Sequence, residues 1–153
     1  MLKSWMVIAV VTLVVALAAN IFRPKDVKWF NRQQRPSWLT FEKLIPLIWI
    51  VIFICGGWSA YITWEQNPGS GHSWMLMAFY LLLEVATVAY TPATLWFQSL
   101  RLGTYVGGVG FVVELILTLL VLQISGWAAL LLLPYLLWSP IGTYTTWTMD
   151  RLN

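Results

Sequence analysis

The chain has 153 residues, of which 59% are hydrophobic and only 10% are charged, and its mean hydropathy is +0.74. A soluble domain carries about 25% charged residues, so nine basic and six acidic side chains are too few to cover a water-facing surface. This leaves little room for a soluble globular protein, a disordered chain or a DNA-binding domain, despite the net charge of +3. Because the chain has one cysteine, Cys55, and one histidine, His72, an internal disulfide and a metal site built on several Cys or His are excluded.

Five long apolar runs follow one another along the chain, at residues 5–22, 44–64, 74–97, 104–124 and 127–149. Each is close to the roughly 20 residues that a helix needs to cross a hydrocarbon core about 30 Å thick. Lipid cannot satisfy open backbone groups, and the period-2 alternation of a β-barrel is absent, so runs of this length indicate helices. The sequence therefore predicts an all-α, multi-pass integral membrane protein, with five transmembrane helices in a single domain over residues 1–153.

The connections between these runs are short, except for the first. Residues 23–43 form a long connecting segment that contains Pro24 and Pro36. The range Asn67–Gly71 is a turn cluster rich in glycine and proline. Ser125 and Gly126 leave almost no loop, so the last two helices are predicted to form a tight antiparallel pair.

Basic residues are distributed very unevenly between the two ends of the predicted helices. One end holds only Lys3, and the other holds Arg23, Lys25, Lys28, Arg32, Arg35, Lys43, Arg101 and Arg151. Since cytoplasmic loops carry the excess of Lys and Arg, the N-terminus is predicted outside and the C-terminus inside. A cleaved signal peptide ending near Ala16–Ala18 is the alternative for the first run, although cleavage would leave basic residues outside the membrane, against the charge rule.

The long connecting segment and the second and fifth runs carry the most specific motifs. Residues 34–38 are Gln-Arg-Pro-Ser-Trp, and residues 46–49 are Pro-Leu-Ile-Trp. Residues 134–138 are Pro-Tyr-Leu-Leu-Trp, and the chain closes with Arg-Leu-Asn at 151–153. In this order and spacing, the motifs resemble the translocator protein family, also called tryptophan-rich sensory proteins (TspO). That family has a K/R-P-S-W loop, helices containing P-x-x-W and P-Y-x-x-W, and a terminal R-x-N.

The resemblance implies a five-helix bundle, often a homodimer, with a pocket under the first long loop (residues 23–43) as its lid. The family's ligands are tetrapyrroles such as protoporphyrin IX and haem, and in some members sterols or synthetic aromatic drugs. We therefore expect a receptor or carrier for tetrapyrroles that has membrane lipid and a small apolar ligand as partners, binds no nucleic acid and requires no cofactor. The residues matched to the family pocket, with Arg35 as a cation at its mouth, are Asn20, Phe30, Arg35, Trp38, Trp49, Phe53, Trp138 and Gly142.

Two alternative functions stay open beside tetrapyrrole binding. The family's usual Asn in the last helix is Thr146 here, and the third and fourth runs lack the Asn, Trp and Asp that the family carries. These departures favour another apolar ligand, such as a sterol, a lipid or a carotenoid. A porphyrin-degrading enzyme is the other alternative. No nucleophile–base pair or metal cluster is evident, so no catalytic or metal-binding residue is assigned, but light- or oxygen-dependent breakdown of a porphyrin needs no such group.

The eleven tryptophans suit a flat aromatic ligand, because an indole offers a large rigid stacking face and one N–H donor. Trp49 and Phe53 are four residues apart and share a helix face, as do Trp138 and Gly142. An arginine such as Arg35 can grip a carboxylate with two hydrogen bonds. The plainer interpretation is that tryptophans near the ends of the runs form the interfacial belt of a membrane protein, and that the inner ones only pack.

Glu84 and Glu114 lie ten residues into the third and fourth runs, near the middle of the predicted membrane. Carboxyl groups at this depth are costly and usually face the bundle interior, which makes each a functional candidate. The two are expected to pair with each other or to bond a tryptophan N–H. The alternative is a purely structural, protonated glutamic acid that is hydrogen-bonded to a neighbouring helix.

Overall fold

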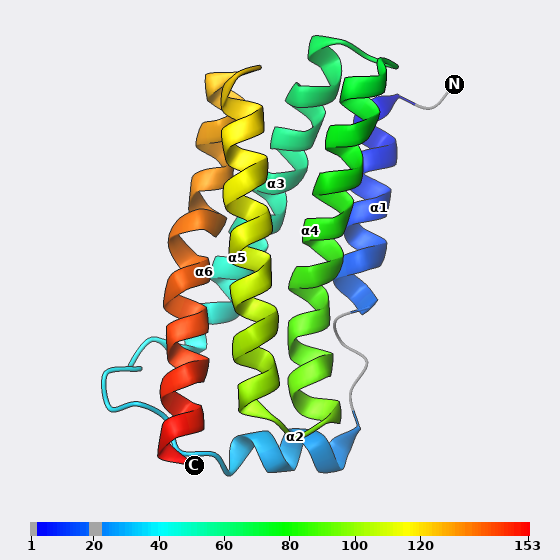
Figure 1. Ribbon diagram of the computed structural model, residues 1–153. Helices are drawn as coiled ribbons and strands as arrows, with labels where there is room; N and C mark the ends of the chain where they lie inside the picture. The colour runs from blue at the N-terminus through cyan, green and yellow to red at the C-terminus, as the bar shows by residue number, and fades with distance from the viewer. Residues whose placement is uncertain (1–2, 19–22) are drawn as a thin grey trace.

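The computed structural model describes residues 3–18 and 23–153, and within these ranges all regular structure is helical. Figure 1 shows the long helices side by side, with the short helix α2 lying across one end of the bundle. The elements are α1 (Ser4–Ala18), α2 (Pro24–Asn31), a short 3-10 turn η1 (Glu42–Leu44), α3 (Ile45–Gln66), α4 (Gly71–Trp96), α5 (Leu100–Leu122) and α6 (Gly126–Leu152).

Serine caps begin the last three helices and keep their connections short. The hydroxyls of Ser70, Ser99 and Ser125 accept hydrogen bonds from the backbone N–H groups of Ser73, Leu102 and Ala128. A serine at this position satisfies one of the open donors of a helix N-terminus. In the turn between α3 and α4, Gly69 has a φ of +79°, a conformation that glycine adopts without steric cost. Successive helices therefore run in opposite directions, as the turn motifs predict.

The outer surface of the bundle exposes many large apolar side chains. Helices α3 to α6 are long and apolar enough to cross a membrane, and residues such as Ile54, Trp127 and Leu137 are exposed on them. Helix α1 is also apolar but has only 15 residues in the described part of the chain. The described structure therefore has four candidate membrane spans, whereas the sequence predicts five. Side chains of this kind face lipid without cost, which fits a multi-pass membrane protein.

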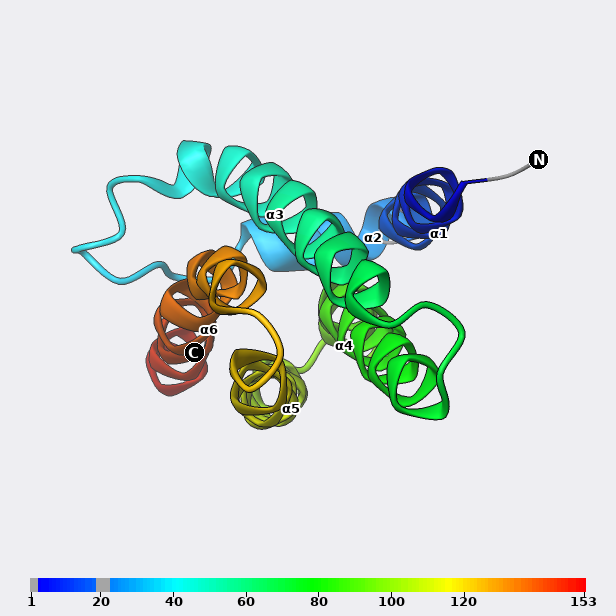
Figure 2. The ribbon, with the colours of Figure 1, turned by 90° about the horizontal axis from the view of Figure 1, so that it is seen from above.

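Helices α3, α4, α5 and α6 enclose the centre of the molecule, whereas α1 lies at its edge. Viewed along the bundle in Figure 2, α3 extends along one side, between α6 and α1. Helix α1 contacts only α3 and α4 extensively, and the α5–α6 pair shares the largest contact of the bundle. A cavity lies between α3, α4, α5 and α6.

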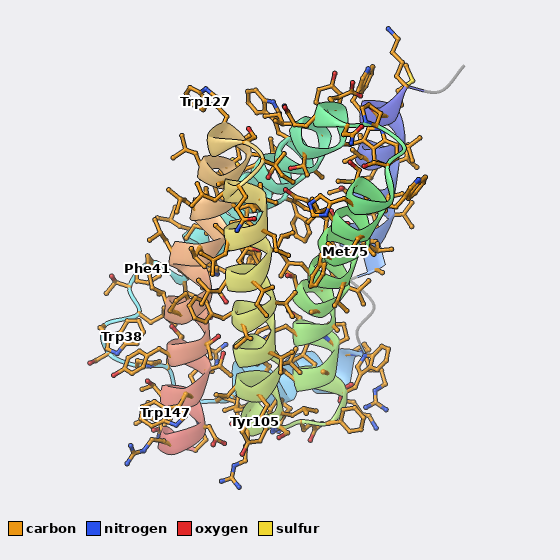
Figure 3. All side chains as sticks on the ribbon, turned by 45° about the horizontal axis from the view of Figure 1, so that its top comes forward. Trp38, Phe41, Met75, Tyr105, Trp127 and Trp147 are labelled. Atoms are coloured by element: carbon orange, nitrogen blue, oxygen red, sulfur yellow. The ribbon has the colours of Figure 1, made fainter. Side chains whose placement is uncertain are left out.

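Basic residues gather at one end of the bundle. Helix α2, the α4–α5 turn and the C-terminus lie at the same end, and the N-terminus lies at the other (Figure 1). Eight of the nine basic residues belong to segments at this end, and Lys3 lies near the N-terminus. Aromatic side chains occur at both ends: Figure 3 shows Trp127 at one and Tyr105 and Trp147 at the other. This is the distribution expected of residues at two membrane interfaces.

Hydrogen bonds of the paired Asp26 and Arg23 to the α4–α5 turn hold α2 against the bundle. Asp26 is fully buried, and its carboxylate accepts hydrogen bonds from Arg23 Nε at 2.6 Å and from Gln98 Nε2 at 3.1 Å. Arg23 also donates to the carbonyl oxygen of Trp96 at the end of α4. The hydrogen bond from Arg23 lowers the pKa of Asp26 below its ordinary value of 3.8. Helix α2, which hydropathy does not predict, is therefore fixed by tertiary contacts.

Candidate ligand-binding site

A cavity of about 330 Å³ lies between α3, α4, α5 and α6, near the end of the bundle where the connecting segment runs. Its walls include Trp49 of α3, Tyr90 of α4, Gly107 of α5 and Trp138 of α6. The connecting segment adds Phe30, Leu39 and Glu42 to the lining. Small-molecule sites are usually clefts of roughly 300–1,000 Å³ with mostly apolar walls and a few polar groups, and this cavity matches that description. We call it the ligand cavity.

Trp138 and Gly142 form the most distinctive part of this wall. The side chain of Trp138 is only 8% exposed, and its Nε1–H has no acceptor among the described residues. A Cβ atom at Gly142 would lie 3.3 Å from Trp138 Nε1, so the absence of a side chain there leaves room for the indole. A buried donor without a partner costs about 1–3 kcal/mol. Trp138 thus offers a hydrogen bond to any acceptor that enters the cavity.

Aromatic rings surround these two residues. The ring of Trp49 meets Tyr135 edge-on, with 6.1 Å between the centroids, and Phe41 meets Trp138 edge-on at 6.2 Å. Edge-to-face pairs at this separation are favourable and fix the ring planes. Trp49, Trp138 and Gly142, which the sequence matched to the family pocket, all line this cavity.

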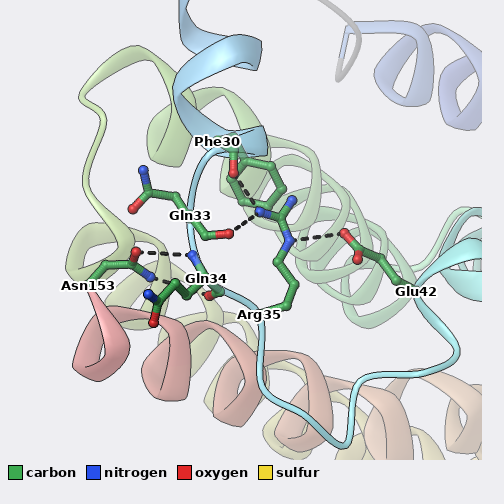
Figure 4. A network of polar contacts seen from close by, with 6 residues as sticks. All are labelled: Phe30, Gln33, Gln34, Arg35, Glu42 and Asn153. Carbon is green, nitrogen blue, oxygen red and sulfur yellow. Dashed lines mark hydrogen bonds and ion pairs between the residues drawn. The ribbon is translucent and has the colours of Figure 1, made fainter.

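Arg35 is bound within the connecting segment. Its Nη1 donates to the carbonyl oxygens of Phe30 and Gln33, both at 2.7 Å, and its Nε donates to Glu42 Oε1 at 3.2 Å. The guanidinium lies over the Phe30 ring, 4.6 Å from its centroid. Figure 4 shows that these contacts fold the segment back on itself. The sequence suggested that Arg35 binds a carboxylate of the ligand. In the structure Arg35 instead binds the carboxylate of Glu42.

The C-terminal residue fastens the same segment to α6. Asn153 Oδ1 accepts from the backbone N–H of Gln34 at 3.0 Å, and Asn153 Nδ2 donates to the Gln34 carbonyl at 3.3 Å (Figure 4). The Asn153 side chain thus satisfies both the backbone N–H and the backbone carbonyl of Gln34. The K/R-P-S-W loop and the terminal R-x-N, which are far apart in sequence, meet here.

Three predicted site residues that the structure describes are not part of this lining, namely Arg35, which is bound to Glu42 as described above, Trp38 and Phe53. Trp38 is 40% exposed and stacks on Tyr144 of α6 with 5.9 Å between the centroids; Figure 3 shows it with Phe41 on the connecting segment beside α6. Phe53 lies 6.3 Å from Trp49 but lines a smaller cavity and an outer groove. Asn20 lies outside the described residues.

The two intramembrane glutamates lie on a separate, smaller cavity of about 30 Å³. Glu84 accepts a hydrogen bond from Thr12 of α1 at 2.8 Å, and the buried Glu114 has Thr118 as its side-chain neighbour at 3.4 Å. The hydrogen bonds found for both carboxyl groups come from threonines, and none comes from the tryptophan N–H that the sequence suggested. Both line the same small cavity, and the expectation that they act as functional groups stays a prediction.

Residues 7–152 match the family model described as TspO/MBR family. This chain belongs to the TspO/MBR family. The Tryptophan-rich protein TspO of Bacillus cereus is 26% identical over 157 aligned residues, covering 100% of this chain and 99% of its own. Translocator protein 2 of Mus musculus is 30% identical, covering 78% and 75% respectively, and the Tryptophan-rich sensory protein of Cereibacter sphaeroides is 26% identical, covering 84% and 79%. The expected family and a multi-pass membrane protein are thus confirmed.

Several hydroxyl groups of this TspO/MBR protein line the ligand cavity without having been predicted. Tyr90 and Thr146 both line it and are hydrogen-bonded to each other across α4 and α6. Ser139 and Thr143 add two more hydroxyls from α6. Tyr90 follows Thr87 by three residues on α4, and this spacing of two hydroxyl groups on one helix face was the available signal. Thr146, which stands where the family usually has Asn, keeps a polar group at that position.

Proposed function

We propose that this protein is a membrane receptor or carrier that binds a tetrapyrrole, such as protoporphyrin IX or haem, in the ligand cavity. The observation that carries the proposal is the buried Trp138 indole beside Gly142, with its N–H unpaired within the described structure. A tetrapyrrole is flat and aromatic, so it gains most from a rigid indole face. The edge-on rings of Trp49 and Tyr135 supply a second aromatic surface.

The connecting segment of residues 23–43 acts as the lid of this cavity. Phe30, Leu39 and Glu42 already line the cavity from this segment. Arg32 and Lys43, exposed on the same segment, supply cations that the propionate groups of a tetrapyrrole can meet. The names of the relatives refer to sensing and to translocation, and a lid that opens at one membrane face suits either role.

Five helices of this protein cross the membrane in the proposed arrangement, namely α1 and α3 to α6. The N-terminus is outside, and the end with α2, the lid and the C-terminus is inside. This orientation is supported by the gathering of basic residues in segments at one end and follows the positive-inside rule. The ligand cavity then opens to the cytoplasmic side or its equivalent.

One observation favours a neutral apolar ligand, such as a sterol, as the second candidate. Among the described residues, the wall of the ligand cavity contains no Lys or Arg, and its single charged residue is Glu42. A dianionic tetrapyrrole must therefore keep its propionates outside the wall, near the lid. A neutral ligand has no such requirement.

The test is a titration of the purified full-length protein in lipid nanodiscs with protoporphyrin IX, followed through the absorbance shift of the porphyrin. We expect saturable binding to the wild type and a loss of at least about tenfold in affinity for Gly142→Leu, whose side chain fills the cavity. The matched control is Gly57→Leu, because Gly57 lies on α3 in the outer groove between α1 and α3. Absence of saturable binding to folded wild type removes the proposal.

A second arm separates the two candidate ligands. The dimethyl ester of protoporphyrin IX keeps the ring but lacks both carboxylates. Weaker binding of the ester, together with weaker binding of the free acid to Arg32→Gln or Lys43→Gln, supports a tetrapyrrole held by the lid cations. Equal binding of acid and ester favours a neutral apolar ligand.

A further inference from the structure

Glu114 is a buried acid whose hydrogen-bonding capacity is largely unused. It is 0% exposed, its Oε2 has no hydrogen-bond partner in the described structure, and its Oε1 has only a long contact of 3.4 Å to Thr118. An ionised carboxylate isolated from water is very costly, and even a neutral one loses free energy without a partner. The small cavity beside Glu114 is therefore the place from which a partner can come.

That cavity has the size and the lining of a water site. Its volume of about 30 Å³ exceeds the roughly 10–15 Å³ that one water requires. Oxygen-bearing side chains line it from two helices besides α5: Tyr80, Glu84 and Thr87 from α4 and Tyr135 from α6. A buried water makes about three hydrogen bonds. The Tyr80 hydroxyl is already bonded to Ser59 and Thr63, so Glu114 Oε2, Glu84 and the Tyr135 hydroxyl are the partners left for a water.

The electrostatic surroundings favour proton exchange over a fixed charge. The ionisable groups that face Glu114 are Tyr80 and Glu84 of α4 and Tyr135 of α6; α3 contributes only Ile52, Phe53 and Gly56. No Lys, Arg or His lines this cavity among the described residues. Without a cation to balance it, Glu114 reaches neutrality by binding a proton.

The small cavity and the ligand cavity have a common wall. Thr87 and Tyr135 line both, and the Thr87 hydroxyl donates to Tyr135 Oη at 3.1 Å. A Cβ at Gly110 would lie 2.9 Å from Tyr135 Oη, so this hydroxyl occupies the place that a side chain would take, one helical turn before Glu114. The Tyr135 ring also meets Trp49 of the ligand cavity edge-on. A ligand that moves this ring therefore also moves a hydroxyl on the wall of the small cavity.

We infer that the small cavity is a second binding site, which holds a water molecule through which Glu114 takes up and releases a proton, and that Thr87 and Tyr135 link it to the ligand cavity. In the uptake step, Glu114 Oε2 accepts a proton from a hydronium ion, forming an O–H bond and leaving a neutral water. In the release step, the O–H bond breaks and the proton returns to that water. The site stands on its own residues, and only its link to the ligand cavity rests on the proposed function.

Infrared difference spectroscopy of the full-length protein without ligand tests the site itself. We expect a C=O stretching band of a protonated carboxylic acid that changes with pH and shifts in D₂O, because water reaches the proton. The band should disappear in Glu114→Gln and persist in Glu84→Gln. Glu114→Gln is isosteric and neutral, so circular dichroism should show that it folds. A band that survives in folded Glu114→Gln, one that does not shift in D₂O, or one that responds to Na⁺ at constant pH overturns the inference.

The link is tested by adding protoporphyrin IX to the same samples. Once binding has been verified by absorbance, the Glu114 band should shift in the wild type and shift much less in Tyr135→Phe, which keeps the ring but loses the hydroxyl. An unmoved band with bound porphyrin refutes the link. If porphyrin does not bind, the proposed function fails. The infrared measurement without ligand still shows whether Glu114 exchanges a proton with water.

Discussion

Two hollows of this protein differ in the chemistry of their walls more than in their size. The ligand cavity measures about 330 Å³, and the groove between α1 and α3 measures about 500 Å³. The cavity has buried aromatic walls, hydroxyl groups and an unpaired indole N–H, and the connecting segment contributes to its lining. The groove is lined by exposed apolar side chains such as Trp58, which is 58% exposed, and Ile54.

This contrast shows which features make a binding site in a membrane protein. Lipid fills an apolar groove on the outer surface, so the groove gives a ligand no advantage over an acyl chain. An enclosed cavity with a donor such as Trp138 Nε1 offers a hydrogen bond, which an acyl chain cannot accept because it has no polar atom. Substitutions in the cavity should therefore change ligand affinity, and matched ones in the groove should not.

The largest expected effect is that of filling each hollow. Gly142→Leu should weaken protoporphyrin IX binding at least about tenfold, because even a Cβ there meets the Trp138 indole. At Gly57 a Cβ has contacts of only 3.8 and 4.0 Å, so Gly57→Leu should leave the affinity unchanged. The porphyrin titration measures both variants, and equal losses would contradict the distinction between the two hollows.

The next effect isolates the indole. Trp138→Phe keeps an aromatic ring but removes the N–H donor and part of the stacking face, and it should cost about 1–2 kcal/mol, or about five- to thirtyfold in affinity. Trp58→Phe in the groove is the matched control. Dissociation constants of the two variants decide the matter, and a larger loss in Trp58→Phe would place the ligand in the groove.

A smaller effect is expected at the lid. Asn153→Ala removes the two hydrogen bonds to Gln34, and each is worth about 0.5–1.5 kcal/mol. The lid should open more often, so the porphyrin should dissociate several times faster while its association rate changes little. Stopped-flow release into excess detergent micelles checks this. An unchanged release rate would mean that the lid does not limit ligand exit.

The smallest effect is the response of α2 to acid. Because Arg23 lowers the pKa of Asp26 below 3.8, the ion pair stabilises the fold fully above about pH 4, and this contribution is lost as the pH falls through the lowered pKa. Thermal unfolding in detergent should therefore show a decrease in stability below pH 4 that Asp26→Asn reduces. A decrease of the same size in Asp26→Asn would assign it to other groups.

The helices could be predicted from the sequence much better than the connecting segment. Four of the apolar runs agree with α3 to α6 to within four residues at each end, because membrane-spanning runs have a strong and uniform composition. Helix α2 was missed: it has only eight residues, most of them polar or aromatic, and its position depends on the contacts of the buried Asp26. Neither hydropathy nor periodicity reports such a tertiary contact.

For the candidate site, the sequence could identify residues that share one face of a helix. It could not identify which other helix or loop packs against that face. Trp138 and Gly142 are one turn apart and lie next to each other in the cavity wall. Trp49 and Phe53 also share a face, yet Phe53 lies beyond the ligand cavity, toward α1. Trp38 belongs to a loop whose direction is set by stacking on Tyr144, and the hydroxyl of Tyr90 becomes a cavity group only through the packing of α4 against α6.

The most direct test of the central claim is an NMR spectrum of the protein labelled with ¹⁵N at its tryptophan indoles, recorded with and without protoporphyrin IX. Trp138→Phe and Trp58→Phe assign the two resonances that matter. The ligand cavity predicts that saturating porphyrin shifts the Trp138 signal and leaves the Trp58 signal in place. A shift of Trp58 with an unmoved Trp138 would contradict it and place the ligand on the outer face of α1 and α3.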